Sequence, residues 1–225
     1  MVPRRSRRGI TRGETSFRAA LGASAREHGR TLSDGELDAL EVHYRLLLRW
    51  NRRINLTGLR GEAAILRRHF LEPIAAADLL GDEGTLVDLG SGNGFPAVPL
   101  KILHPRLCLV MVESSEKRSA FLWAVIRETG LTGARVETRR VRAAADLSDL
   151  LPCRHLTSRG VRAPDLLRDR GGAPAVLEPG GRALLFVAEK DAAALRGRPL
   201  PGTTVTGTRR LPGAGSIVAI LEPGD

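Results

Sequence analysis

The sequence contains little of what metal proteins, secreted proteins and membrane proteins depend on. It has two cysteines, Cys108 and Cys153, without the spacing of a metal site, so we expect no metal and a reducing compartment. Cys108 lies within an apolar run and is expected to be a small core residue. No apolar run approaches the roughly 18 residues of a membrane span, and the charged N-terminus lacks the apolar segment of a secretory signal. We therefore expect a cytoplasmic protein with no membrane partner.

Aromatic residues are also scarce, whereas arginine is abundant. Only 4% of the residues are aromatic, so few side chains are available to stack on nucleobases. The net charge is +10 and the pI is near 11.1, which favours a polyanionic partner. Eight arginines against two acidic residues make residues 1–30 resemble a disordered basic arm. An arginine-rich genome would also raise the total, so the clusters of arginine are more informative than their number.

The glycine-rich turn within residues 86–95 (LVDLGSGNGF) is the most informative stretch. An apolar strand that carries one acid is followed by a turn with three glycines, Gly90, Gly92 and Gly94, and then by a helix. This arrangement is typical of a nucleotide-type cofactor site. A dinucleotide site requires G-x-G-x-x-G, and Phe95 stands where its last glycine would be. The pattern looks instead like the S-adenosylmethionine loop of class I methyltransferases, with Gly90 and Gly92 binding the cofactor. A plain strand-to-helix turn and an NAD-dependent reductase are the alternatives.

The residues after this turn complete a βαβ unit. Pro96 and Pro99 fit the first turn of a helix that Pro105 ends. The apolar run 107–112 then predicts a strand buried on both faces, which ends at Glu113. An acid at this position can accept hydrogen bonds from both ribose hydroxyls of an adenosine. We favour this role for Glu113 over that of a solvated strand end.

Two groups of arginines are candidates for binding RNA phosphates. A helix is predicted over 33–52, with a capping box formed by Ser33 and Glu36 at its start. The first group of arginines recurs at helical intervals toward the end of this helix. A solvated helix face explains these arginines at least as well as RNA binding does. The second follows a short strand predicted over 135–138, beside the expected cofactor edge. The RNA-binding candidates are Arg45, Arg49, Arg52, Arg53, Arg139 and Arg140.

The remaining elements alternate between helix and strand. Helices are predicted over 62–79 and 115–129, and a strand over 182–188. Residues 203–208 and 216–221 are predicted to form a closing hairpin. This alternation favours an α/β fold whose sheet is mostly parallel, with one antiparallel strand near its edge.

Several motifs occur in a specific order along the chain. They are WNRRINLT (50–57), HFLE (69–72), DLGSGNGFP (88–96), PL (99–100), KR (117–118), FL (121–122) and SR (158–159). Their order and spacing resemble the bacterial ribosomal RNA small subunit methyltransferase G family, also called glucose-inhibited division protein B. The resemblance runs from about residue 31 to the C-terminus and leaves residues 1–30 outside it.

The resemblance implies a class I S-adenosylmethionine-dependent methyltransferase fold, Rossmann-like, with a seven-stranded sheet and an N-terminal helical extension. The chain would divide into a basic arm (1–30), a helical subdomain (31–82) and a methyltransferase domain (83–225). The implied activity is methylation of guanine N7 in 16S rRNA, with the small ribosomal subunit or its assembly intermediate as partner and S-adenosylmethionine as cofactor. For the oligomeric state, a monomer is favoured.

The resemblance also implies cofactor contacts beyond the glycine turn. The family's contacts fall on Gly90 and Phe95, on the pair Val141 and Arg142, and on Arg159. The family usually has glutamate where this chain has Arg142, a harmless change if the contact uses backbone N–H groups. Arg159 would orient the methionine carboxylate or hold an RNA phosphate, with a surface salt bridge as the alternative.

No catalytic acid or base is expected, because guanine N7 carries a free lone pair and loses no proton on methylation. The enzyme would act by proximity and alignment. Two further hypotheses stay open at this point. One is a methyltransferase for another RNA or a small molecule, and the other is a catalytically weak RNA-binding ribosome assembly factor.

Overall fold

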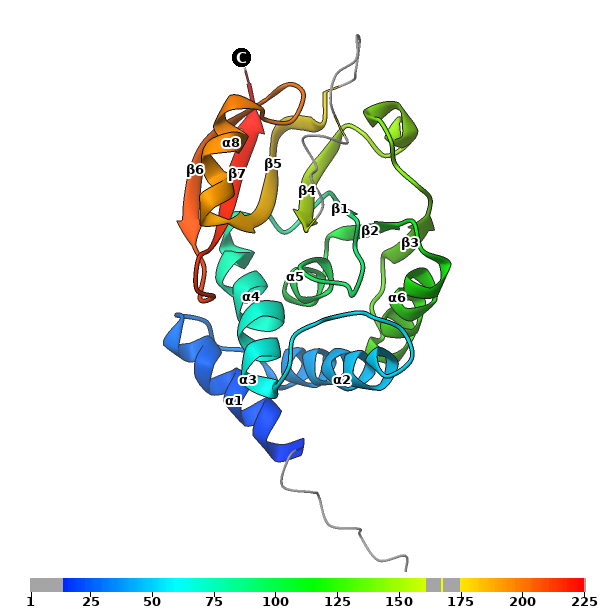
Figure 1. Cartoon of the computed structure of the whole chain (residues 1–225), viewed down its shortest axis with the longest axis vertical. Coiled ribbons are helices and arrows are strands. Elements are labelled where there is room, and N and C mark those ends of the chain that lie inside the picture. Colours follow the sequence, from blue (N-terminus) through cyan, green and yellow to red (C-terminus); the bar gives the residue numbers. More distant parts are fainter. Residues whose placement is uncertain (1–13, 161–166, 168–174, 225) are drawn as a thin grey trace, which may run out of the picture.

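The computed structural model of the chain describes residues 14–160, 167 and 175–224. These residues form a seven-stranded sheet with helices on both faces (Figure 1). The strand order is β3-β2-β1-β4-β5-β7-β6, and β7 runs antiparallel to β5 and β6, so the mostly parallel sheet and the closing hairpin are confirmed. The strands are β1 (Thr85–Leu89), β2 (Cys108–Glu113), β3 (Ala134–Thr138), β4 (Cys153–Arg159), β5 (Leu177–Ala188), β6 (Thr203–Arg210) and β7 (Ser216–Pro223).

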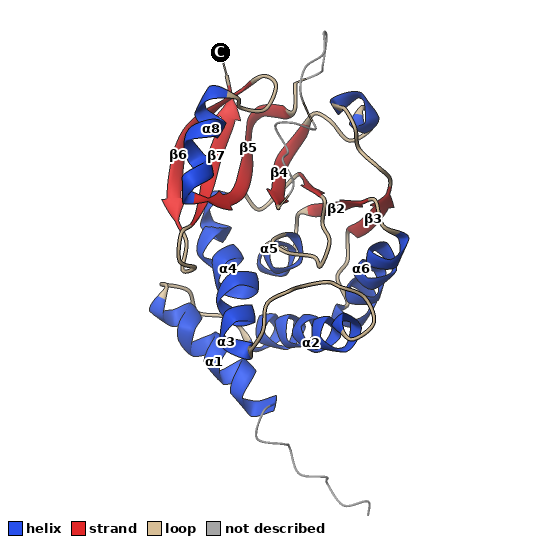
Figure 2. Ribbon diagram, in the orientation of Figure 1, coloured by secondary structure: helices blue, strands red, loops and turns tan. Residues whose placement is uncertain are grey.

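The helices gather mainly on one side of this sheet (Figure 2). The helix predicted over 62–79 is one continuous helical segment that changes type along its length, and its π-helical part carries Arg68 and His69. Short π segments often mark functional positions. The helical elements are α1 (Glu14–Glu27), α2 (Asp34–Asn51), α3 (Glu62–Ile65), the π-helix η1 (Leu66–Leu71), α4 (Glu72–Ala76), η2 (Ala77–Leu79), α5 (Ala97–Leu103), α6 (Glu116–Thr129), η3 (Ala144–Leu147), η4 (Glu189–Asp191) and α8 (Ala192–Gly197).

Local sequence signals place the ends of the main helices. The capping box at the start of α2 is confirmed: the Ser33 backbone N–H donates to Glu36 Oε2 (2.6 Å), and the Glu36 N–H donates to Ser33 Oγ (3.3 Å). Helix α6 ends at Gly130, whose φ of 68° lies in the left-handed region that glycine tolerates. The proline-rich helix α5 ends just before Pro105, as predicted.

The prediction of a disordered arm over residues 1–30 is wrong for its second half. Residues 14–27 form α1, and Phe17, Leu21 and Ala25 on one face of this helix are fully buried. The arginine content obscured this four-residue apolar spacing, which packs α1 against the helical layer. The arginines at positions 4 to 12 lie outside the described residues.

Alternating side chains of the strands build two hydrophobic cores. In β1, Leu86 faces the core shared with α1, α2, α5 and α6, whereas Val87 and Leu89 face the core covered by α8 and η3. The helices before residue 83 therefore share one core with the sheet. The predicted helical subdomain and methyltransferase domain follow one another in the sequence, but they pack around a common core.

The prediction that Cys108 is a core residue is wrong. It is the first residue of β2, paired with Thr85, the first residue of β1, and its side chain is exposed. Burial of the strand begins with the next residue, Leu109. Cys153 is buried, and burial raises the pKa of its thiol to about 12, which leaves it a neutral core side chain.

Candidate active site

The candidate site lies where the strand order reverses, between β1 and β4. Ligands of open α/β sheets bind outside the carboxyl ends of the strands at such a switch point. Ser158 Oγ donates to the Leu89 carbonyl (3.1 Å) across this pair of strands. The glycine turn begins directly after Leu89, at Gly90. Gly90, Gly92 and Gly94 have φ values of 69°, 52° and 81°, which explains why each is glycine.

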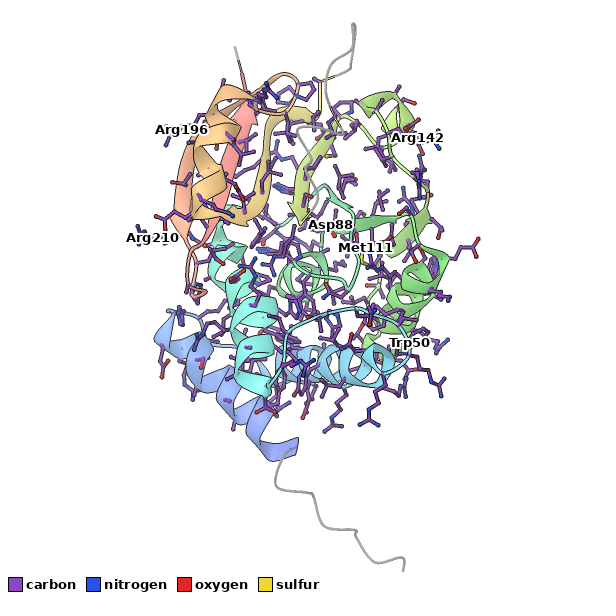
Figure 3. All side chains as sticks on the ribbon, viewed as in Figure 1. Trp50, Asp88, Met111, Arg142, Arg196 and Arg210 are labelled. Carbon is purple, nitrogen blue, oxygen red and sulfur yellow. The ribbon has the colours of Figure 1, made fainter. Side chains whose placement is uncertain are left out.

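The acid before the turn, Asp88, is buried in the centre of the molecule (Figure 3). Thr157 Oγ1 donates to its Oδ1 (2.6 Å), and its Oδ2 has no hydrogen-bond partner among the described residues. Burial raises the pKa of Asp88 to about 6, although the Thr157 hydroxyl and the charge of Arg159 act in the opposite direction. The hydrogen bond between Thr157 and Asp88 links β4 to β1.

Glu113 lies at the carboxyl end of β2, as predicted, and is buried. Its Oε2 accepts a hydrogen bond from the Gly92 N–H (2.8 Å), and its Oε1 accepts one from the Ser115 N–H (2.8 Å). The carboxylate thus joins the glycine turn to the start of α6. This anchoring of the turn is a role that the sequence did not indicate.

Phe95 points into the helical layer and not toward the strand ends. Its buried ring stacks on His43 of α2 (4.3 Å between centroids) and on His69 of η1 (4.6 Å). A cofactor contact at Phe95 would therefore have to use its backbone. The side chain joins the turn to the helices, which the spacing of the glycines could not reveal.

A polar network also holds the turn, and sequence reasoning assigned none of its members to the site. Asn51 Oδ1 accepts from the N–H groups of Leu56 and Thr57 (2.9 and 3.0 Å), which fixes the loop after α2. Asn93 Nδ2 donates to the Leu56 carbonyl (3.1 Å), and Thr57 Oγ1 lies 2.9 Å from His69 Nε2. The WNRRINLT and HFLE motifs contain these residues, apart from Asn93 of the turn, and were the available sign of the network in the sequence. In the structure the two motifs contact each other through Thr57 and His69, and the first contacts the turn through Leu56 and Asn93.

Arg159 lies at the end of β4 in a buried ion-pair cluster. Its Nη2 donates to Glu72 Oε2 (2.9 Å), while Arg68 donates to the other carboxylate oxygen of Glu72 (3.1 Å). The surface salt bridge considered for Arg159 is wrong, because the Arg159 and Glu72 side chains are only 10% and 1% exposed. Arg159 Nε has no partner among the described residues.

Val141 and Arg142 follow β3 at the rim of the molecule, where Figure 3 shows Arg142. The backbone N–H groups of Arg142 and Ala143 both donate to Asp146 Oδ2 (2.7 and 3.1 Å). The Arg142 side chain is exposed. A backbone contact to the cofactor at Arg142 would therefore compete with Asp146.

The predicted RNA-binding arginines differ in how free they are. Arg139 makes a bidentate ion pair with Asp149 (2.7 and 2.8 Å) and a further contact with Glu137, which raise its pKa and occupy its guanidinium. Arg45 pairs with Glu41 (3.1 Å) along the same helix. Within the described part of the chain, four of the candidates are exposed and form no ion pair: Arg49, Arg52, Arg53 and Arg140.

A family model described as rRNA small subunit methyltransferase G matches residues 36–197, which contain the whole of this site. The chain belongs to that family. Two curated relatives named Ribosomal RNA small subunit methyltransferase G agree: that of Myxococcus xanthus is 33% identical over 172 residues (76% of this chain, 78% of the relative). That of Syntrophotalea carbinolica is 32% identical over 165 residues (70% and 76%).

Solved structures confirm that this chain has the fold of class I S-adenosylmethionine-dependent methyltransferases. A tRNA methyltransferase from Bacillus subtilis superposes with a TM-score of 0.52 at 14% identity, covering 71% of this chain and 68% of that one. An S-adenosylmethionine-dependent methyltransferase from Aquifex aeolicus gives 0.50 at 14% identity, covering 68% and 89%.

The described residues contain no group of three or more His, Cys, Asp or Glu that would suit a metal ion. No helix in the described ranges has the length and apolar character that a membrane crossing requires.

Proposed function

We propose that this chain transfers the methyl group of S-adenosylmethionine to guanine N7 of 16S rRNA in the small ribosomal subunit or its assembly intermediate. The observation that carries the proposal is the coincidence of a complete cofactor turn with the family match. Gly90, Gly92, Gly94 and Glu113 all lie within residues 36–197 and share one end of the sheet. A small-subunit substrate implies that the protein acts in the cytoplasm.

The residues present fit this cofactor. The turn offers bare glycine backbone and a buried carboxylate at the end of β2, the position from which an acid binds ribose hydroxyls. Asp88 Oδ2 and Arg159 Nε are buried polar atoms without partners among the described residues, at the ends of the two central strands. We assign Glu113 to the ribose, Arg159 Nε to the methionine carboxylate, and backbone contacts to Phe95 and Val141. Arg142 would contribute its backbone N–H in exchange for its bond to Asp146 Oδ2.

The chemistry requires alignment more than acid–base catalysis. S-adenosylmethionine supplies a methyl group on a positively charged sulfur, and guanine N7 attacks with a lone pair that carries no proton. Burial, followed by the charge of Arg159, lowers the pKa of His69 to about 3, so His69 is neutral at pH 7 and is held by Thr57. The chain's own residues therefore position two reactants and exclude water, which can lower a barrier by roughly 7–11 kcal/mol.

Four exposed arginines are proposed to bind rRNA phosphates. Arg49, Arg52 and Arg53 lie at the end of α2, where Trp50 packs on Phe121 of α6 (5.8 Å between ring centroids), and Arg140 follows β3. Because these cations form no ion pair in the described structure, they can bind phosphate without first losing a protein partner.

The deciding experiment supplies undermethylated small subunits, naked 16S rRNA and labelled S-adenosylmethionine, and maps the modified base by mass spectrometry. We expect label on a guanine N7 of 16S rRNA. Cofactor binding without transfer to any of these substrates would instead favour an RNA-binding assembly factor. Label on another RNA or on a small molecule would replace the proposed substrate.

The arginine assignment predicts a specific change in salt dependence. Arg52→Gln with Arg53→Gln should weaken RNA binding and flatten the slope of log K against log salt by about 0.7–0.9 for each phosphate that the variant no longer neutralises. Arg196→Gln with Arg210→Gln is the matched control, because it also removes two exposed positive charges and Figure 3 shows both residues at the far edge from Trp50. Equal slopes for the two double variants would remove Arg52 and Arg53 from the interface.

A further inference from the structure

We propose that His43, in the middle of α2, is a positioning residue for the cofactor turn. The inference rests on the proposed function only in taking residues 90–94 to bind S-adenosylmethionine. His43 lies 50 positions before the turn and has no exposed surface. Its ring also lies near Phe70 of η1 (5.9 Å between centroids) and Phe121 of α6 (6.2 Å), but its hydrogen bond is made to the turn.

The His43 ring contacts three consecutive residues of the turn. Its Nε2–H donates to the carbonyl of Asn93 (2.9 Å), and its ring is nearly parallel to that of Phe95 (11°, 4.3 Å between centroids). Between these contacts the ring lies against the bare backbone of Gly94: a Cβ there would be 3.3 Å from its Cε1 and Nε2. Val98 Cγ2 would be 3.0 Å from the same Cβ, so His43 and Val98 together pack against Gly94.

The hydrogen bond defines the state of the imidazole. A carbonyl oxygen can only accept, so Nε2 carries the proton and Nδ1 does not. Nδ1 is buried without a partner among the described residues, and burial lowers the pKa of His43 to about 4. A neutral imidazole with one unsatisfied nitrogen is a costlier way to fill a core than a phenyl ring, because a buried polar atom loses its water. Packing alone does not explain histidine here, whereas the bond to Asn93 does.

The turn depends on such external contacts because it is glycine-rich. Three glycines with positive φ lose more conformational entropy on ordering than other residues would. Several contacts hold the turn. On the strand side Glu113 binds the Gly92 N–H, and on the helix side His43 binds Asn93 and Phe95, beside the bond from Asn93 to the Leu56 carbonyl. Loosening the contact of Glu113 or that of His43 should weaken cofactor binding without changing the rate of transfer once the cofactor is bound.

The test compares two buried histidines in the full chain. His43→Phe keeps a ring on Phe95 and removes the donor to Asn93, and His43→Gln keeps a donor and removes the ring. The control is His155→Phe on β4, which is 3% exposed, has its pKa lowered by burial to about 4, and pairs with Leu86, well before the turn. The readouts are the Kd for S-adenosylmethionine by calorimetry, the melting temperature, and KM and kcat for transfer.

For His43→Phe we expect the Kd and KM for S-adenosylmethionine to rise about tenfold, with kcat within twofold of wild type, since one hydrogen bond is worth about that factor. For His43→Gln the Kd should rise less than tenfold, and for His155→Phe it should stay unchanged. An unchanged Kd in folded His43→Phe, or equal changes in His43→Phe and His155→Phe, would overturn the proposal. The calorimetry uses no RNA, so its result does not depend on which RNA is methylated.

Discussion

Glu113→Gln is expected to raise the Kd for S-adenosylmethionine by about a hundredfold while the chain stays folded. In the structure both oxygens of Glu113 accept backbone hydrogen bonds, one of them from Gly92 in the cofactor turn. Glutamine replaces one of these acceptors by an NH2 group, which cannot accept, and removes the charge proposed to bind the ribose. Two charge-assisted hydrogen bonds at about 1.5 kcal/mol each correspond to roughly a hundredfold in affinity.

Glu116→Gln provides the matched control for this variant. Glu116 lies three residues further on, in the first turn of α6, and is exposed. Neutralising it changes the net charge of the chain by the same amount, so a difference between the two variants reports on position and not on charge. A Kd for Glu113→Gln within threefold of that for Glu116→Gln would contradict the ribose assignment.

Glu72→Ala is expected to lower the free energy of unfolding by about 3–5 kcal/mol. Its carboxylate holds both Arg68 and Arg159, and the Glu72 side chain is 1% exposed. Alanine would remove the carboxylate that is hydrogen-bonded to the buried guanidinium of Arg159, which accounts for most of the loss. Urea denaturation followed by circular dichroism measures the change.

Asp78→Ala is the control that distinguishes the loss of a buried ion pair from the loss of an exposed one. Asp78 follows in the same helical segment and pairs with Arg209, but its side chain is 65% exposed. An exposed pair contributes about 0–1 kcal/mol, so this variant should be nearly as stable as wild type. Comparable losses in the two variants would show that the Glu72 cluster is not desolvated in solution.

The cofactor unit could be predicted from the sequence because its signals are local. Glycines at 90, 92 and 94, prolines around α5 and an apolar run before Glu113 each constrain the backbone within a few residues. These signals placed the strand, turn, helix and second strand nearly at their observed positions. The alternation of helix and strand patterns then predicted the order of the later elements.

The tertiary contacts of the site could not be predicted in the same way. The partner of Arg159 is 87 positions away in the sequence, and that of His43 is 50 positions away. The helix over 33–52 could be predicted, but nothing in its sequence distinguishes a histidine that fills space from one that binds a carbonyl. The ion pair between Arg139 and Asp149 could not be predicted either, because a cluster of arginines gives no sign of the acids that fold back onto it.

The aromatic contacts of the helical layer have a consequence for how such a protein can evolve. Phe17 of α1 lies 5.1 Å from Phe70 between ring centroids, and Phe70 lies 4.9 Å from Phe95 in the cofactor turn. A continuous series of rings therefore links the N-terminal helix to the cofactor turn. A change of side-chain size at Phe17 or Phe70 is constrained by the turn as well as by the helical layer.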